Sequence, residues 1–246
     1  MPDEIPFGPS PSNGCFIIPV IHSLNVKQVA RNIEIAIDAG VNGIFLINHD
    51  FGIDKFLPII REVRTKFPRI WMGVNFLSVT GKFAFPILAE LESQGYRVNA
   101  YWADNACIAE NTNNQFEADE IANVRLNCGW RGLYFGGVAF KKQRQISKEH
   151  FEDVARRAAK FMDVITTSGV ATGEAADLNK VSQFRKGAGK HPIAVASGIS
   201  SENINYYSSV NVFLVATGIN IMGDFYNICP NRLRELITLA KDMECC

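Results

Sequence analysis

The chain has 246 residues, of which 47% are hydrophobic and 20% charged, and its 25 basic residues balance 25 acidic ones. This length forms one large domain or two small ones and is sufficient to bury a sizeable core. The balanced charge excludes the strong field by which proteins attract nucleic acids or anionic membrane surfaces. We therefore expect a globular protein that has neither nucleic acid nor a membrane surface as its partner.

The first 14 residues, "MPDEIPFGPSPSNG", are polar, acidic and rich in Pro and Gly, unlike a secretory signal. They predict a flexible N-terminal arm over residues 1–14. The longest apolar run, residues 15–21, is far shorter than the roughly 20 residues that span a bilayer. We expect a cytoplasmic protein with no membrane span.

Six cysteines occur without a C-x-x-C pair or a histidine at zinc spacing, which favours free thiols over a disulfide framework or a metal clip. The adjacent Cys245 and Cys246 leave lipidation open as an alternative.

Apolar runs of the length of β-strands recur along the chain with little polar alternation, as is typical of parallel strands buried on both faces. There are eight, over residues 16–21, 43–48, 70–76, 98–102, 132–140, 163–168, 191–197 and 212–217.

Segments with helical spacing of apolar residues lie between these runs, for example residues 56–67 and 151–162. Eight strand-helix units in a chain of this length predict a closed (β/α)8 barrel over residues 15–246, a single α/β domain. The competing open sheet is disfavoured because no G-x-G-x-x-G follows the first strand. The fourth unit is the least regular, because residues 105–120 form a long polar connection.

Three similar phrases, "TSGVATG", "ASGIS" and "VATGI", follow the sixth, seventh and eighth runs. Loops after these strands commonly bind phosphate in such barrels, and glycine lets backbone N–H groups approach an anion. A helix predicted to begin near Ser201 would point its positive end at the same place. The predicted phosphate-binding residues are Thr167, Ser168, Gly169, Thr172, Gly173, Ser197, Gly198, Ser200, Thr217 and Gly218. In the alternative interpretation, glycine only turns the chain and Ser200 caps the helix.

Titratable or amide residues at the other strand ends could supply an acid, a base and hydroxyl contacts. The candidate catalytic residues are His22, Asp50, Asn75, Asp104 and Lys141. Asp50 and Asp104 form a carboxylate pair if the barrel brings them close, and Lys141 is a candidate Schiff-base amine. The alternatives are that His22 is a core or loop residue, that Asp50 caps a helix and that Lys141 belongs to a solvated basic turn.

No metal site is predicted, because the side chains of His49 and Asp50 diverge on a strand. No cofactor is predicted either, although the phosphate of a flavin can use the same barrel site. A homo-oligomer is compatible with the sequence.

Several stretches resemble the BtpA family, namely "VIHSLN", "AIDAGVNGIFLINHDF", "MGVNFL", "YRVNAYWADNA", "DVITTSGVATGEAADLNKV" and "IAVASGIS". The similarity runs from about Ile18 to Gly223. It implies a phosphate-binding TIM barrel; the family takes its name from photosystem I biogenesis, and its relatives also occur in organisms without photosynthesis.

The chain departs from the family pattern at two places. It lacks the Pro-rich "LPPLPG" stretch behind His22, and it has Lys141-Lys142 where the family has a Lys-His pair.

The predicted site and the resemblance leave two functions open. The first is an enzyme, such as an isomerase, a lyase or a catalyst of glycosyl-bond chemistry, that acts on a phosphorylated sugar or nucleotide. The second is a non-catalytic assembly or regulatory factor that retains the phosphate pocket.

Overall fold

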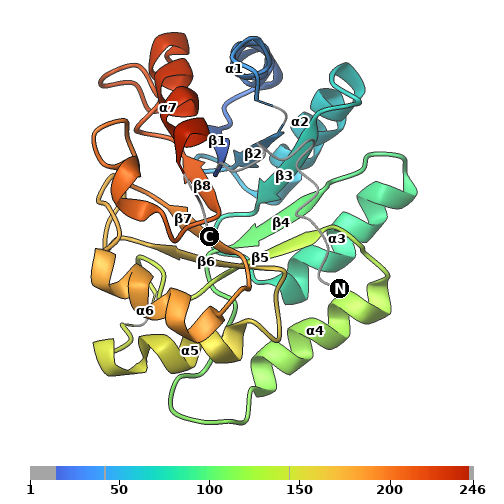
Figure 1. Cartoon of the computed structure of the whole chain (residues 1–246). Coiled ribbons are helices and arrows are strands. Elements are labelled where there is room, and N and C mark those ends of the chain that lie inside the picture. Colours follow the sequence, from blue (N-terminus) through green and yellow to red (C-terminus); the bar gives the residue numbers. More distant parts are fainter. Residues whose placement is uncertain (1–14, 42, 144, 244–246) are drawn as a thin grey trace.

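Eight parallel strands close into a barrel in which each strand pairs with its neighbours in sequence and β1 pairs with β8 (Figure 1). The computed structural model describes residues 15–41, 43–143 and 145–243; the expected arm over residues 1–14 and the Cys245-Cys246 end lie outside this range. The strands are β1 Phe16–His22, β2 Gly43–Ile47, β3 Trp71–Asn75, β4 Ala100–Ala103, β5 Leu133–Gly137, β6 Val164–Ser168, β7 Ile193–Ala196 and β8 Val212–Val215. The predicted (β/α)8 barrel is confirmed.

Helices surround the barrel on the outside, as Figure 1 shows. Over the described ranges they are α1 Val26–Asp38, α2 Ile53–Lys66, α3 Gly81–Ser93, α4 Phe116–Cys128, η1 Lys148–His150, α5 Phe151–Ala158, α6 Leu178–Ala188, η2 Ile204–Tyr207 and α7 Pro230–Asp242, where η marks a 3₁₀ helix. None of these helices is long and apolar enough to cross a bilayer.

The α-helix expected to begin near Ser201 is wrong, because only the four-residue η2 follows β7. The side chain of Asn203 accepts a hydrogen bond from the Ser200 backbone N–H and donates one to the Gly198 carbonyl. Such local side-chain bonds compete with a helical backbone. This segment therefore offers no helix dipole to an anion.

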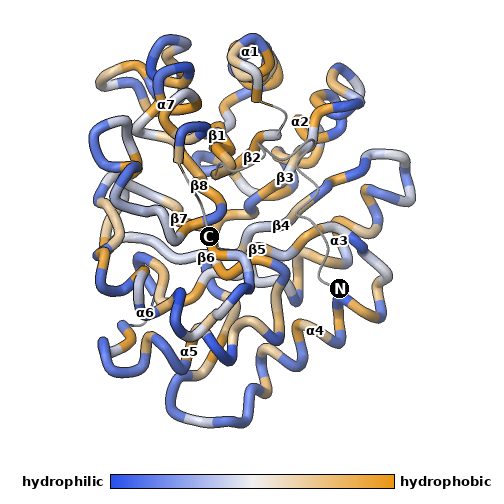
Figure 2. Tube along the Cα trace, in the orientation of Figure 1, coloured by the Kyte–Doolittle hydropathy of each residue, from blue (hydrophilic) through white to orange (hydrophobic). Residues whose placement is uncertain are grey.

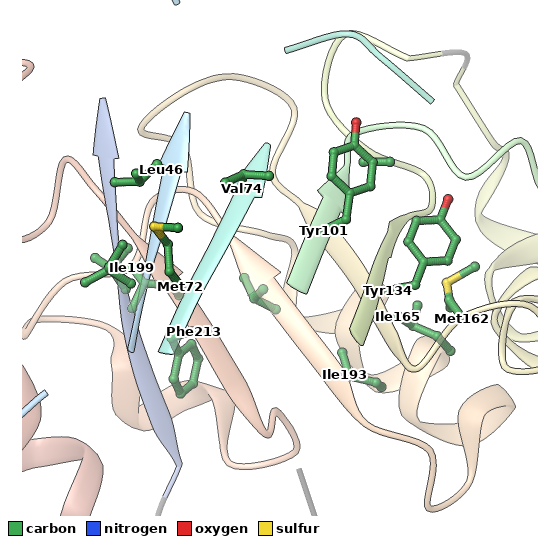
Figure 3. Close-up of a cluster of buried hydrophobic side chains, with 14 of the residues drawn as sticks. Leu46, Met72, Val74, Tyr101, Tyr134, Met162, Ile165, Ile193, Ile199 and Phe213 are labelled. Carbon is green, nitrogen blue, oxygen red and sulfur yellow. The ribbon is translucent and has the colours of Figure 1, made fainter. Parts of the chain in front are cut away.

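Apolar side chains fill two separate layers, one inside the barrel and one between the strands and the helices. Inside, the ring of Phe45 packs edge-on against Trp71, Trp102 and Phe135, and Gly73 leaves room for it because a Cβ there would lie 2.2 Å from the Phe45 ring. The outer layer includes Leu46, Met72, Val74, Tyr101, Tyr134, Ile165 and Phe213 (Figure 3). The opposite faces of one strand thus serve different layers.

Each of the α-helices named above buries apolar residues. In α1, Val29, Ile33 and Ala36 are buried at helical spacing, and the Asn25 side chain caps the helix by accepting the Gln28 N–H at 2.9 Å. Along the traces in Figure 2, apolar segments alternate with polar ones on the helices. The polar faces point to solvent, so the barrel is covered and its strand ends remain as the place for a site.

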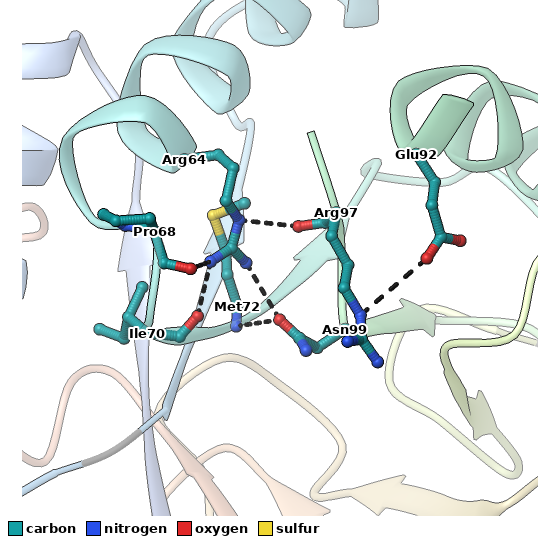
Figure 4. Close-up of polar contacts among 7 residues, drawn as sticks. All are labelled: Arg64, Pro68, Ile70, Met72, Glu92, Arg97 and Asn99. Atoms are coloured by element: carbon teal, nitrogen blue, oxygen red, sulfur yellow. Dashed lines mark hydrogen bonds and ion pairs between the residues drawn. The ribbon is translucent and has the colours of Figure 1, made fainter. Parts of the chain in front are cut away.

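A buried arginine ties the amino ends of β3 and β4 together (Figure 4). The guanidinium of Arg64 donates to the carbonyls of Arg97 and Ile70 at 2.8 Å and to the side chain of Asn99 at 3.0 Å. Asn99 Oδ1 also accepts the Met72 N–H at 3.0 Å. Burial lowers the pKa of Arg64 to about 10, so it stays charged at neutral pH.

The same arrangement recurs in two other units. Arg125 on α4 bonds Asp163, which accepts the Tyr134 N–H. Arg185 on α6 bonds Asn211, which accepts the Ile193 N–H. In each of the three units, an arginine on a helix donates a hydrogen bond to the side chain of the residue just before β4, β6 or β8. That side chain accepts a backbone N–H from the preceding strand. The barrel is therefore fastened at its amino ends, away from the strand ends where chemistry occurs in this fold.

Cys107, Cys128 and Cys229 have free thiols, as expected. It is wrong for Cys15, which is disulfide-bonded. Short spacing motifs say nothing of cysteines that the fold brings together from distant parts of a chain.

Candidate active site

A cavity of about 200 Å³ opens at the carboxyl ends of the strands. Its floor consists of apolar side chains that point into the barrel, namely Val20, Ile47, Trp102, Ala196 and Leu214. Its walls are polar and include His22, His49, Ser78, Asp104, Lys141, Lys142, Gln143, Thr172, Gly173, Ser197 and Thr217. In the order of the barrel, titratable groups come from the segments of β1 to β5 and hydroxyl or glycine residues from those of β6 to β8.

His22 ends β1 and is only 6% exposed. Its ring centroid lies 4.7 Å from that of His49 and 3.8 Å from that of Phe225. Burial, with the positive charges of His49 and Lys141 nearby, lowers the pKa of His22 to about 3. The imidazole is therefore neutral at physiological pH, and its buried Nδ1 has no hydrogen-bond partner in the described part of the chain.

Asp104 follows β4 and accepts a hydrogen bond from Asn75 Nδ2 at 3.0 Å. Burial raises the pKa of Asp104, against the opposing effects of Asn75, Lys141 and Lys142. Asn75 is fully buried at the end of β3 and does not line the cavity. It thus acts on the cavity through the carboxyl group that it holds.

Lys141 follows β5 and also lines the cavity. Its backbone N–H donates to Ser168 Oγ at 2.8 Å. Burial and the charge of Lys142 lower the pKa of its amine, whereas Asp104 raises it. The position of Lys141 is compatible with the predicted role as a site residue. It does not fit the alternative of a wholly solvated turn, because Lys141 is partly buried.

Another lysine fixes the loop that carries Lys141. The side chain of Lys180 on α6 is 9% exposed and donates to the carbonyls of Ala139 and, at 2.9 Å, Ser168. Its amine lies 5.7 Å from the ring centroid of Phe151 and 5.9 Å from that of Phe184. Burial lowers the pKa of Lys180 to about 8. Lys180 joins the ends of β5 and β6 and so sets the position of the Lys141 backbone.

On the opposite wall, four of the predicted phosphate-binding residues line the cavity, namely Thr172, Gly173, Ser197 and Thr217. The backbone N–H groups of Gly198, Thr217 and Gly218 donate no hydrogen bond to any part of the described chain. The hydroxyl of Ser197 donates to the carbonyl oxygens of Ala171 at 2.9 Å and Glu174 at 3.2 Å. Ser197 therefore joins two loops, and the free N–H groups remain as donors.

The glycines of the repeated phrases allow three loops to pack backbone against backbone. A Cβ at Gly169 would lie 2.2 Å from the Glu174 carbonyl oxygen, and one at Gly198 would lie 2.1 Å from the Ala175 nitrogen. A Cβ at Gly218 would lie 1.8 Å from the Ile199 carbonyl oxygen. Only glycine fits at these three contacts.

Some predicted residues lie outside the cavity lining. Asp50 is exposed and accepts a hydrogen bond from the Tyr226 hydroxyl at 3.1 Å, so it is not beside Asp104 in the cavity. Thr167 is fully buried, and strand alternation directs it with Ile165 toward the helices. The remaining residues of the predicted phosphate set that do not line the cavity are Ser168, Gly169, Gly198, Ser200 and Gly218.

Several residues that line the cavity were not selected as site residues, His49 and Trp102 among them. His49 lies two positions beyond the inward-facing Ile47, and Trp102 lies two positions before Asp104. Counting in steps of two from the interior residues of β2 and β4 would have selected both and excluded Asp50. Trp102 is 4% exposed and its Nε1 has no partner among the described residues.

No three His, Cys, Asp or Glu side chains gather at one point of the described chain in a way that could hold a metal ion. The cavity therefore offers proton-transfer groups, an amine and hydrogen-bond donors.

Solved structures with the same architecture are numerous. Tryptophan synthase subunit alpha from Legionella pneumophila is 12% identical, with a TM-score of 0.65 and coverage of 93% of each chain. Orotidine 5'-monophosphate decarboxylase from Methanocaldococcus jannaschii is 12% identical, with a TM-score of 0.59 over 94% of this chain and 100% of that one. Phosphoribosyl anthranilate isomerase from Thermus thermophilus is 11% identical, with a TM-score of 0.56 over 91% of this chain and 96% of that one. At these identities the likeness shows the TIM-barrel fold alone.

No curated protein matches the chain. The model of the BtpA family matches residues 53–242, well over half of the sequence. The match includes β3 to β8 and therefore most of the cavity, but not His22 or His49. The chain belongs to the BtpA family.

Proposed function

We propose that this protein is an enzyme that acts on a small phosphorylated molecule held in the cavity at the strand ends. The observation that carries the proposal is the division of this one cavity. Its β1 to β5 side presents His22, His49, Asp104 and Lys141, and its β6 to β8 side presents hydroxyl groups and the free backbone N–H group of Thr217. Binding energy from an anchored phosphate can orient the rest of a substrate for reaction.

Several features favour phosphate at the β6 to β8 side. Free N–H groups at Gly198, Thr217 and Gly218 are suitable donors for anion oxygens, and the Thr172 and Thr217 side chains are exposed there. The names of orotidine 5'-monophosphate decarboxylase and phosphoribosyl anthranilate isomerase also refer to phosphorylated compounds.

The size of the cavity favours a sugar phosphate over a nucleotide. Its volume of about 200 Å³ lies below the roughly 300–1,000 Å³ typical of pockets for larger ligands. The apolar floor, which includes Trp102, can support the carbon skeleton of a short sugar.

The chemical groups support proton transfer at the other end of the substrate. Burial raises the pKa of the Asp104 carboxyl group, which favours it as a proton donor over an ordinary aspartate, and the imidazole of His49 on the same wall can accept a proton. An isomerase, a lyase and an enzyme of glycosyl-bond chemistry each need this combination.

The experiment compares the thermal stability of the protein with phosphorylated sugars, their unphosphorylated counterparts and inorganic phosphate. The test variant is Thr217→Asp, which adds a carboxylate at an exposed position in the cavity wall. The matched control is Thr238→Asp, which adds the same charge at an exposed position on α7. Gly198 is unsuitable because any side chain there overlaps the Ala175 backbone.

A phosphorylated compound at a hundred times its dissociation constant should stabilise the wild type and the control by about 2.7 kcal/mol, and the Thr217→Asp variant by much less. If no phosphorylated compound stabilises the wild type, the proposal is wrong and a non-catalytic assembly or regulatory factor becomes the better explanation. Equal stabilisation of Thr217→Asp would place the phosphate elsewhere.

A further inference from the structure

We propose that the side-chain amine of Lys141 is a nucleophile that forms an imine with the carbonyl carbon of a phosphorylated aldehyde or ketone bound in the cavity. This inference rests on the proposed function, because the phosphate anchor brings the carbonyl group to Lys141. It narrows the substrate class to phosphorylated carbonyl compounds and assigns a covalent step to one residue.

The geometry around Lys141 provides a fixed backbone and a free amine. The backbone is held by Ser168 Oγ at the Lys141 N–H and by Lys180 at the carbonyl of Ala139. The side chain extends into the cavity, with its nitrogen 5.8 Å from the centroid of the Phe140 ring. No hydrogen bond or ion pair within the described ranges holds this nitrogen.

An amine reacts with a carbonyl group only in its neutral form. Partial burial and the adjacent Lys142 both shift Lys141 toward that form, since both lower the pKa of its amine. A phosphate bound at the opposite wall would leave the amine facing the substrate carbon chain.

The two other lysines near the cavity are less suitable. Lys180 uses its nitrogen to bond the carbonyls of Ala139 and Ser168, and it does not line the cavity. Lys142 lines the cavity, but the residue is exposed, whereas Lys141 is partly buried.

The covalent step balances with the groups present. The Lys141 nitrogen bonds the carbonyl carbon as the carbonyl π electrons move to oxygen, and the Asp104 carboxyl group donates a proton to that oxygen. The nitrogen then returns its own proton to the Asp104 carboxylate. A second transfer of a proton to the hydroxyl group releases water and leaves the carbon-nitrogen double bond, so amine and carbonyl give imine and water. The Asp104 carboxylate then takes the remaining proton from nitrogen and returns to its starting form.

Reduction with borohydride tests this step because hydride converts an imine into a stable secondary amine. The full-length protein is incubated separately with glyceraldehyde 3-phosphate, dihydroxyacetone phosphate and pyridoxal 5'-phosphate, and then with borohydride. Intact mass and peptide mapping locate the adduct. We expect one adduct per chain, on Lys141, and its loss when the unphosphorylated aldehydes or ketones replace the phosphorylated probes.

The variants are Lys141→Met and the control Lys148→Met, which removes an exposed lysine of η1 that does not line the cavity. Labelling should be lost in the first and kept in the second, while urea unfolding shows that both are folded. Adducts on Lys142 or on surface lysines only, or no adduct with any of the three probes, would overturn the inference.

The result separates this inference from the proposed function. If phosphorylated compounds stabilise the protein without Lys141 being labelled, the phosphate site stands and the imine step is wrong. If they neither stabilise nor label it, both proposals fail.

Discussion

Gly198 lies so close to Ala175 that a Cβ on Gly198 would be 2.1 Å from the Ala175 backbone nitrogen. The contact joins the loops after β6 and β7, where Ser197 also bonds the carbonyls of Ala171 and Glu174. Glycine at this position therefore serves the packing of the loops, and the phosphate site that we propose depends on that packing.

Replacement of Gly198 by alanine should lower the free energy of unfolding by at least about 2 kcal/mol, because the methyl group overlaps backbone atoms and φ is +68°. Gly173 is the matched control, since its φ is +82° but nothing lies within 4 Å of its Cβ position. Gly173→Ala should cost only about 1 kcal/mol, the strain of a left-handed backbone. Urea unfolding measures both; equal losses would show that strain alone decides.

His22 should remain neutral well below pH 6.5, because burial lowers its pKa to about 3. Above pH 6.5 both folded and unfolded states hold this imidazole neutral, so its contribution is fully present. As pH falls from 6.5 to about 3, only the unfolded state gains the proton, and the free energy of unfolding decreases by up to about 5 kcal/mol. NMR titration of the ring protons, assigned with His22→Gln, tests this. A midpoint near pH 6.5 for His22 would contradict it.

Lys180 should make the free energy of unfolding depend on pH in the alkaline range. Its pKa is lowered from 10.5 to about 8, so between these values the unfolded state holds a proton that the folded state has lost. The free energy of unfolding therefore rises with pH across this window by up to about 3 kcal/mol from this group. The difference in unfolding free energy between wild type and Lys180→Met, measured from pH 7.5 to 10.5, should increase accordingly. A difference that does not change with pH would show that Lys180 titrates as an ordinary lysine.

Arg64 should contribute strongly to stability through its bonds to the ends of β3 and β4. Arg64→Met leaves the carbonyls of Arg97 and Ile70 without their donor, and we expect a loss of about 3 kcal/mol. Arg61 is on the same helix, but its half-buried side chain bonds the side chain of Gln94 and lies over the Tyr96 ring without holding a backbone carbonyl of a strand end, so Arg61→Met should cost about 1 kcal/mol or less. Thermal and urea unfolding compare the two.

The barrel was predictable from the sequence because parallel strands buried on both faces appear as continuous apolar runs. Such runs begin within two residues of every observed strand. Strand ends were also identified well enough to place His22, Asp104 and Lys141 at the cavity.

The side on which each residue points was not fully anticipated. Asp50 and His49 are adjacent, yet only His49 faces the cavity, because alternation along β2 directs it with Ile47. The close approach of Gly198 to Ala175 could not be predicted either, since it depends on how two loops meet. Lys180 and Arg64 resemble ordinary surface residues of amphipathic helices until the fold buries them.

We propose that one cavity holds the phosphate at the β6 to β8 side and the reacting carbon at the β1 to β5 side. This arrangement would be visible in a crystal structure of the protein with the phosphorylated sugar that stabilises it most. We predict that the phosphate oxygens accept hydrogen bonds from the N–H groups of Gly198, Thr217 and Gly218, with the carbon chain directed toward Asp104 and Lys141. A phosphate bound outside the strand ends, or a ligand lying in the reverse direction, would contradict it.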